Sequence, residues 1–126
     1  MVPRLLIVED DSEINHLLRG LFLTEGYEVE CVTSVDAANA ALDRDGFDVV
    51  LLDWLLNEET GEALLPRLAA MVPAPAVVLI STSPRASAIA KKWSIAFVAK
   101  PCQVDVLLGV IKGAVDQSSF ALLRQP

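Results

Sequence analysis

The segment FDVVLLDWLLNEETG, residues 47–61, decides the fold class. It holds the apolar run Val49–Leu52, which ends on a single carboxylate, Asp53. An unbroken apolar run of this length is typical of a strand that is buried on both faces of a parallel sheet. Burying an unpaired carboxylate is costly, so Asp53 at the end of such a strand is expected to have a functional partner.

Four other short apolar runs alternate with helical patterns along the chain. They are Leu5–Val8, Tyr27–Val32, Val77–Ile80 and Ile95–Val98. Together with the run before Asp53 they predict five βα units, and so an α/β fold on a doubly wound, five-stranded parallel sheet. Tyr27–Val32 alternates apolar and polar residues and is expected at one edge, whereas the other runs are expected to be covered on both faces.

Five helices are expected between and after these strands. The first has apolar residues at helical spacing and a glycine stop: Ile14, Leu17, Leu18, Leu21, Phe22 and Gly26. The later ones are centred on residues 37–42, 64–68, 86–93 and 104–111. Ser83 and Pro84 predict an N-cap followed by proline at the first helical position. Because proline is tolerated only in a first turn, Pro66 predicts that the third helix begins late or bends.

Length and composition indicate one domain. The chain has 126 residues, 53% of them hydrophobic, and can bury a core of its own. We expect a domain over residues 1–116, followed by a tail, linker remnant or extra helical turn over residues 117–126. The apolar runs are too short to cross a bilayer, and no signal-peptide core follows Met1, so a cytoplasmic protein without membrane contact is expected.

The charge of the chain limits the classes of molecule that it can bind, and its cysteine spacing bears on metal and redox sites. The formal net charge is -7, and the ten basic residues are spread thinly. Binding to nucleic acid needs clustered basic residues, so no direct nucleic-acid contact is expected, and the partners should be proteins or small cationic species. Cys31 and Cys102 lack the spacing of a metal site or a redox pair and are expected to be reduced packing residues.

Chemistry is expected at the carboxyl ends of the strands, because ligands bind there in open doubly wound sheets. The polar residues that follow four of the runs are, in chain order, Glu9, Asp10 and Asp11; Asp53; Ser81 and Thr82; and Lys100. Several carboxylates, a hydroxyl and an ammonium should therefore meet at one edge of the sheet.

An acidic cluster of this kind calls for a cation. Two carboxylates about 5 Å apart repel by roughly 3 kcal/mol at an effective dielectric of about 20, and a third adds to the repulsion. Oxygen ligands suit Mg²⁺, which prefers carboxylates, keeps several waters and often shares its shell with phosphate. Lys100 and the Ser81 hydroxyl would then face the anionic oxygens of that phosphate.

The order of these motifs resembles that of a known family. LLIVEDD, DVVLLDWLLNEETG, VVLIST and FVAKP occur in the order found in receiver domains of two-component response regulators, and the resemblance spans residues 3–115. It implies a flavodoxin-like (βα)5 sheet with strand order 2-1-3-4-5. It also implies a phosphoacceptor rather than an ordinary enzyme: a domain that takes phosphate from a histidine kinase or a histidine phosphotransfer protein and assists its own dephosphorylation.

The resemblance also implies roles for individual residues. Asp53 would be the nucleophile that accepts phosphate. The metal site would be formed by Glu9, Asp10, Asp53 and the backbone carbonyl of Leu55. The phosphoryl group would meet Ser81 and Lys100, Phe97 would be an aromatic switch, and the bond from Lys100 to Pro101 would be cis. The output would be altered contact with a downstream protein of unknown identity, and a homodimer is compatible with the resemblance.

Two departures from the family pattern fall near these motifs. Asn57 and Thr60 stand where the family usually has proline and an acidic residue, although Gly61 is kept. The interval from Ser81 to Lys100 is also a few residues shorter than usual. The loop after the nucleophile and the output contacts are therefore the features that the resemblance determines least.

Structural interpretations of the same residues stay open. Asp53 alone could be a turn carboxylate, and Asp10 or Asp11 could cap the first helix. Thr82 rivals Ser81 as the relevant hydroxyl. Phe97 could be an ordinary core residue.

Other functions share parts of the pattern. A pseudo-receiver would be a phosphorylation-independent interaction module, and failure to bind Mg²⁺ would favour it. A nucleotide- or flavin-binding domain would need a glycine-rich loop after the first strand, and a small aspartyl phosphatase would need a second aspartate where Leu55 stands. The phosphoacceptor is therefore the predicted function, either as a stand-alone receiver or as part of a longer regulator.

Overall fold

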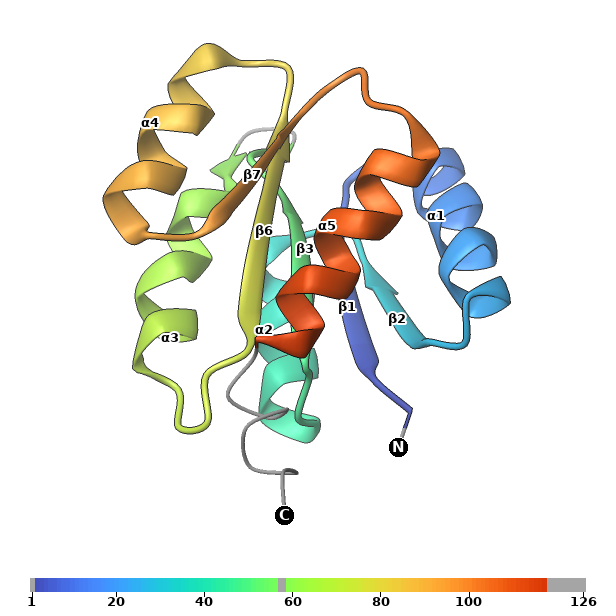
Figure 1. The fold of residues 1–126 in the computed structure, drawn as a ribbon. Helices are drawn as coiled ribbons and strands as arrows, with labels where there is room; N and C mark the ends of the chain where they lie inside the picture. Colours follow the sequence, from blue (N-terminus) through green and yellow to red (C-terminus); the bar gives the residue numbers. More distant parts are fainter. Residues whose placement is uncertain (1, 57–58, 118–126) are drawn as a thin grey trace.

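The computed structural model describes residues 2–56 and 59–117, and a sheet of five parallel strands forms its centre (Figure 1). The strands are β1 (Arg4–Val8), β2 (Glu28–Val32), β3 (Val49–Asp53), β6 (Ala76–Ser81) and β7 (Ala96–Ala99). Their order across the sheet is β2-β1-β3-β6-β7, which is 2-1-3-4-5 when these strands are counted along the chain. The predicted α/β fold with a doubly wound, flavodoxin-like sheet is confirmed.

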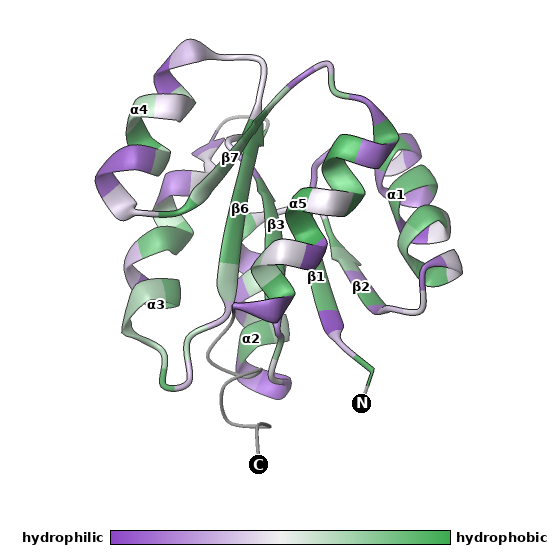
Figure 2. Cartoon of the chain, in the orientation of Figure 1, coloured by the Kyte–Doolittle hydropathy of each residue, from purple (hydrophilic) through white to green (hydrophobic). Residues whose placement is uncertain are grey.

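Helices cover both faces of the sheet and divide the core in two (Figure 1). The first face is covered by α1 (Ser12–Thr24) and α5 (Val104–Asp116). The second is covered by α2 (Val35–Arg44), α3 (Leu65–Ala70) and α4 (Pro84–Trp93). Alternate apolar residues of β1 and β3 belong to the two cores, and Figure 2 shows most of the length of each strand as hydrophobic. This burial on both faces explains the unbroken apolar runs of the sequence.

The first helix buries only part of the apolar face that its spacing predicts: Leu18, Leu21 and Phe22 pack on the core. Ile14 and Leu17 are 37% and 71% exposed, whereas Asn15 and Phe22 are buried. The Asn15 side chain donates hydrogen bonds to two backbone carbonyls at the strand ends, which offsets the burial of its NH2 group. With Asn15 turned inward, Ile14 and Leu17 are left facing solvent.

The edges of the sheet are β2, as predicted, and β7. The expectation that the fifth strand is covered on both faces is wrong for Ala96 and Ala99, which are exposed. An edge strand has a neighbour on one side only, and the helices cover this one incompletely. Only Val98 of β7 is buried.

The helix boundaries predicted from Ser83, Pro84 and Pro66 are confirmed. Ser83 caps α4, and Pro84 is the first residue of that helix. The third helix begins late: a 3-10 turn, η1 (Gly61–Leu64), comes before α3, and Pro66 lies in the first turn of α3. In that position the missing N–H of proline leaves no helical hydrogen bond broken.

A short antiparallel hairpin follows β3 and is not signalled by the sequence pattern. Its strands are β4 (Leu55–Leu56) and β5 (Glu59–Thr60). Thr60 is thus paired, while Asn57 lies outside the described residues, as do residues 118–126 of the expected tail. None of the helices in the described part of the chain is long and apolar enough to cross a membrane.

Candidate functional site

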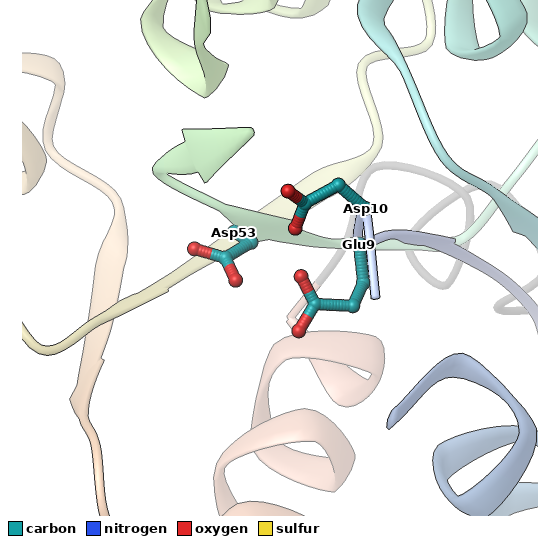
Figure 3. Close-up of side chains that lie close together, drawn as sticks. All are labelled: Glu9, Asp10 and Asp53. Carbon is teal, nitrogen blue, oxygen red and sulfur yellow. The ribbon is translucent and has the colours of Figure 1, made fainter. Parts of the chain in front are cut away.

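Two neighbouring strand ends bring three carboxylates together. Glu9 and Asp10 follow β1, and Asp53 is the last residue of β3, the strand that pairs with β1 in parallel. One carboxylate oxygen of each residue lies within 4.8 Å of the others. Figure 3 shows the three side chains pointing toward one another. The acidic cluster expected from the sequence therefore has the geometry of a cation site.

Lys100 reaches this cluster from the far edge strand, β7. Its Nζ lies 2.7 Å from Oδ2 of Asp53 and 3.4 Å from Oε1 of Glu9. The Lys100 side chain is 26% exposed, whereas those of Asp53 and Glu9 are almost fully buried. The ammonium thus already offsets part of the negative charge of the cluster before any phosphate is present.

Burial raises the pKa of Glu9 to about 8, and the hydrogen bond and the negative charge of Asp53 act in the same direction, while the positive charge of Lys100 opposes them. Burial alone would lower the pKa of Lys100, but its hydrogen bond to Asp53 and the two neighbouring carboxylates raise it above its ordinary value. At neutral pH without a metal, Glu9 is therefore largely protonated and Lys100 is charged. A divalent cation at the cluster would take the place of the Glu9 proton.

The donor set fits a hard divalent cation. All three groups are carboxylates, and Oε2 of Glu9 is buried without a hydrogen-bond donor among the described residues. An ionised carboxylate oxygen left in this way is costly unless a proton or a cation meets it. Asp10 is only partly buried, which leaves one side of the cluster open to solvent. Oxygen ligands with room for retained water match Mg²⁺.

Comparison with known protein families decides what kind of domain this is. Residues 5–112 match the response regulator receiver domain. The chain belongs to this family. Its receiver motifs are therefore those of a two-component system, as the sequence predicts.

Relatives and solved structures agree with this assignment. The receiver is 32% identical over 107 residues to the alginate biosynthesis transcriptional regulatory protein AlgB of Pseudomonas aeruginosa, covering 82% of this chain and 24% of AlgB. It is also 32% identical to the sensory transduction protein RegX3 of Mycobacterium bovis, over 88% of this chain and 41% of RegX3. The chain thus spans less than half the length of these two regulators.

Among solved structures, the receiver domain (CheY-like) from Methanospirillum hungatei JF-1 superposes with a TM-score of 0.85 at 27% identity, covering 93% of this chain and 96% of that one. NtrX from Brucella abortus, solved in complex with ATP, gives a TM-score of 0.85 at 28% identity and covers 96% of this chain and 28% of that one. Both likenesses extend over nearly the whole receiver.

The remaining predicted residues of the receiver site lie at the neighbouring strand ends. Ser81 is buried at the end of β6, where its Oγ accepts a hydrogen bond from the N–H of Ser83 at 3.0 Å. Its carbonyl accepts from the N–H of Lys100 at 2.9 Å, which ties the ends of β6 and β7 together. The peptide bond from Lys100 to Pro101 is cis, as the resemblance implies.

Leu55 and Phe97 occupy different surroundings. The N–H of Leu55 donates to Oδ1 of Asp53 at 3.0 Å, while its side chain is 47% exposed beside the site. The metal contact predicted for Leu55 is through its carbonyl, a different backbone group, and stays a prediction. Phe97 is half-buried and packs on the core that α3 and α4 cover. The half-buried ring lies three residues before Lys100, and its role as a switch stays a prediction.

Gly61 lies close against the backbone at the end of β3, where Asp53 stands. Its N–H donates to the carbonyl of Trp54 at 2.8 Å, and the N–H of Trp54 donates to that of Ile80 at 3.1 Å. A Cβ atom on Gly61 would lie 2.6 Å from the backbone oxygen of Asp53 and 2.8 Å from Cγ of Leu52. The close approach of two backbones explains why the chain has glycine here.

Two residues near the site are not found by reading the strand ends. Asn15 is buried beside Glu9, and its sequence signal is a polar residue on the inward face of an amphipathic helix. The guanidinium of Arg85 lies 5.9 Å from the centre of the Trp54 ring, so the first turn of α4 contacts the residue after Asp53. A contact between residues so distant in the sequence has no local signal.

Proposed function

We propose that this receiver accepts a phosphoryl group on Asp53 with the help of Mg²⁺ and so changes its contacts with other proteins. The observation that carries the proposal is the placement of Asp53 between two further carboxylates and the ammonium of Lys100. Incubation with a small-molecule phosphodonor and Mg²⁺, followed by intact-mass measurement, tests it. A chain that bound no Mg²⁺ and took up no phosphate would instead be a pseudo-receiver.

In the proposed reaction an oxygen of Asp53 attacks the phosphorus of phosphohistidine on a kinase or phosphotransfer protein. The new P–O bond forms as the P–N bond breaks, and the electron pair of that bond leaves with the histidine nitrogen. Glu9, Asp10, Asp53 and the carbonyl of Leu55 would hold Mg²⁺, which when bound supplies positive charge for the incoming phosphoryl oxygens. Attack of water on the same phosphorus would later return Asp53 to its free state.

Each carboxylate oxygen of Asp53 accepts a hydrogen bond from a different donor. The N–H of Leu55 holds Oδ1, and the ammonium of Lys100 holds Oδ2. Both donors orient the carboxylate before transfer, because a hydrogen bond to each oxygen fixes the plane of the group. After transfer, Lys100 can exchange its contact with Asp53 for one with a phosphoryl oxygen, and the Ser81 hydroxyl can donate its hydrogen to another phosphoryl oxygen. These exchanges would bias the loops after β6 and β7 and the position of Phe97.

The proposed partners follow from the family. A histidine kinase or histidine phosphotransfer protein would supply the phosphate, and an unidentified protein, another domain of a longer regulator or a second copy of the chain would respond to it. AlgB is named as a transcriptional regulatory protein, so a DNA-binding part elsewhere in a longer regulator is one form of output. The receiver itself, proposed to span residues 1–116, would act in the cytoplasm through protein contacts and would not bind nucleic acid directly.

Loss of Asp10 is expected to weaken Mg²⁺ binding by about tenfold or more, since removing 1.4 kcal/mol of attraction is enough for tenfold. Trp54 follows the nucleophile, so Mg²⁺ or a beryllium fluoride complex should change tryptophan emission. The measurement is a titration of Asp10→Ala against the parent, both carrying Trp93→Phe to remove the second tryptophan. An unchanged midpoint in Asp10→Ala would place the metal elsewhere.

Lys100→Ala is expected to take up phosphate and yet to switch incompletely. The loss of one charge-assisted contact should slow uptake by less than about tenfold, because Asp53 and the cation site remain. The variant lacks the ammonium that would contact the phosphoryl group only after transfer. The amide chemical shifts of residues 95–100 should therefore move less than in the parent. Lys112→Ala, an exposed lysine of α5, is the matched control. A full parental shift in Lys100→Ala would remove Lys100 from the switch.

A further inference from the structure

Asn15 is a buried polar side chain at the ends of two strands. It lies in the first turn of α1 and is 6% exposed. Its Nδ2 donates to the carbonyl of Glu9 at 2.5 Å and to that of Val32 at 3.3 Å. If Oδ1 and Nδ2 of Asn15 were exchanged, the amide oxygen would face two carbonyl oxygens. The contacts therefore identify the atom that faces them as the nitrogen.

These contacts hold the backbone from which two carboxylates of the cluster project. The N–H of Glu9 donates to the carbonyl of Val32 at 3.0 Å, and the carbonyl of Glu9 accepts from Asn15. Both backbone groups of Glu9 are thereby engaged. Because a peptide unit is planar, fixing the Glu9 carbonyl also fixes the direction of the N–H of Asp10 and the position of the Asp10 Cα, from which the side chain starts.

The start of α1 delivers Asn15 to this position. Oδ1 of Asp11 accepts from the N–H groups of Glu13 and Ile14, which caps the helix, and the N–H of Asn15 donates to the carbonyl of Asp11. The chain therefore leaves β1, makes one capped turn and returns a side-chain amide to the peptide between Glu9 and Asp10. This short loop joins the helix start to the cation cluster without using any carboxylate of that cluster.

We propose that Asn15 is a positioning residue of the cation site. Its amide fixes the peptide between Glu9 and Asp10 and so sets where their carboxylates stand relative to Asp53. The inference rests on the proposed function, because it gives Asn15 its role through Mg²⁺. Groups that orient metal ligands without touching the metal typically change metal affinity by about 10- to 100-fold.

The test compares Asn15→Leu and Asn15→Asp with the parent by Mg²⁺ titration of tryptophan emission, all in the Trp93→Phe background. Both variants lose the amide donors and are expected to bind Mg²⁺ about tenfold more weakly. Asn15→Asp separates two causes, because it keeps the shape of the side chain and adds a negative charge. If charge alone governed affinity, this variant would bind Mg²⁺ more tightly than the parent.

A second readout separates positioning from a general loss of structure. At saturating Mg²⁺ both variants should recover a phosphate-uptake rate close to that of the parent, because Asp53 and Lys100 are intact. His16→Ala, which changes the adjacent exposed residue of the same turn, should keep the parental Mg²⁺ affinity. A parental affinity in Asn15→Leu, tighter binding in Asn15→Asp, or a rate deficit that persists at saturating Mg²⁺ would each overturn the inference.

The parent protein gives a measurement that does not depend on the folding of a variant. The side-chain amide protons of Asn15 should exchange with solvent more slowly than those of the exposed Gln103, and their signals should move with the same midpoint as the tryptophan emission when Mg²⁺ is added. Exchange as fast as that of Gln103 would overturn the inference. A parent that binds no Mg²⁺ would contradict the proposed function itself, whereas a parent that binds it, with equal binding by the Asn15 variants, would contradict only the role of Asn15.

Discussion

Asp53→Asn is expected to take up no phosphate under conditions in which the parent takes up about one phosphoryl group per chain. The substituted amide has nearly the same shape but is not a nucleophile, so no acyl phosphate can form. The fold should persist, because the amide oxygen can still accept from Leu55 or Lys100 and one buried negative charge of the cluster is gone. Intact mass after incubation with a small-molecule phosphodonor and Mg²⁺ measures the difference, and treatment with base should remove the label from the parent.

The control for this experiment is Asp116→Asn, which makes the same chemical change at an exposed position at the end of α5. It should label like the parent. Equal labelling of Asp53→Asn and the parent would show that phosphate goes to another residue. The carboxylate cluster would then be a structural feature of the strand ends.

Gly61→Ala is expected to lower the free energy of unfolding by about 2 kcal/mol or more, at the upper part of the range for overpacked sites. The new methyl carbon would lie 2.6 Å from the backbone oxygen of Asp53, and a backbone atom cannot rotate away as a side chain can. The hairpin after β3 would have to move, and with it the nucleophile. Urea unfolding measures the stability, and phosphate uptake measures the displacement of Asp53.

Gly109→Ala serves as the control for a glycine in open surroundings. Nothing lies within 4 Å of the Cβ that it would add, and the residue is in the interior of α5. It should raise the free energy of unfolding by about 0.5–1 kcal/mol, since alanine is the better helix former. If Gly61→Ala proved as stable as the parent, the close approach of the two backbones would not constrain this loop.

The sheet and its acidic cluster can be predicted from the sequence because both depend on local patterns. Apolar runs such as Val49–Leu52 mark buried parallel strands, and parallel strands carry the residues at their ends to one edge. That rule is enough to bring Glu9 and Asp53 together. The helix caps at Asp11 and Ser83 are likewise local, since each needs only its own next few residues.

Features that depend on contacts between distant segments are not predictable in this way. The inward turn of Asn15 is stabilised by carbonyls of β1 and β2, so a pattern of apolar spacing in α1 alone selects Ile14 and Leu17 wrongly. The hairpin after β3 lacks the alternation of a longer strand pair. Lys100 is predicted at the same edge from its place after the fifth strand, but its direct contact with Asp53 depends on the course of a long side chain, which no spacing specifies.

The sequence distances within the site have a consequence for how the protein is made. Lys100 meets Glu9 and Asp53 across separations of 91 and 47 residues. The strand that precedes Lys100, β7, is synthesised after the other strands of the sheet. A nascent chain on the ribosome therefore carries Asp53 well before it carries Lys100. The proposed phosphoacceptor site is complete only once β7 has been synthesised and has joined the sheet.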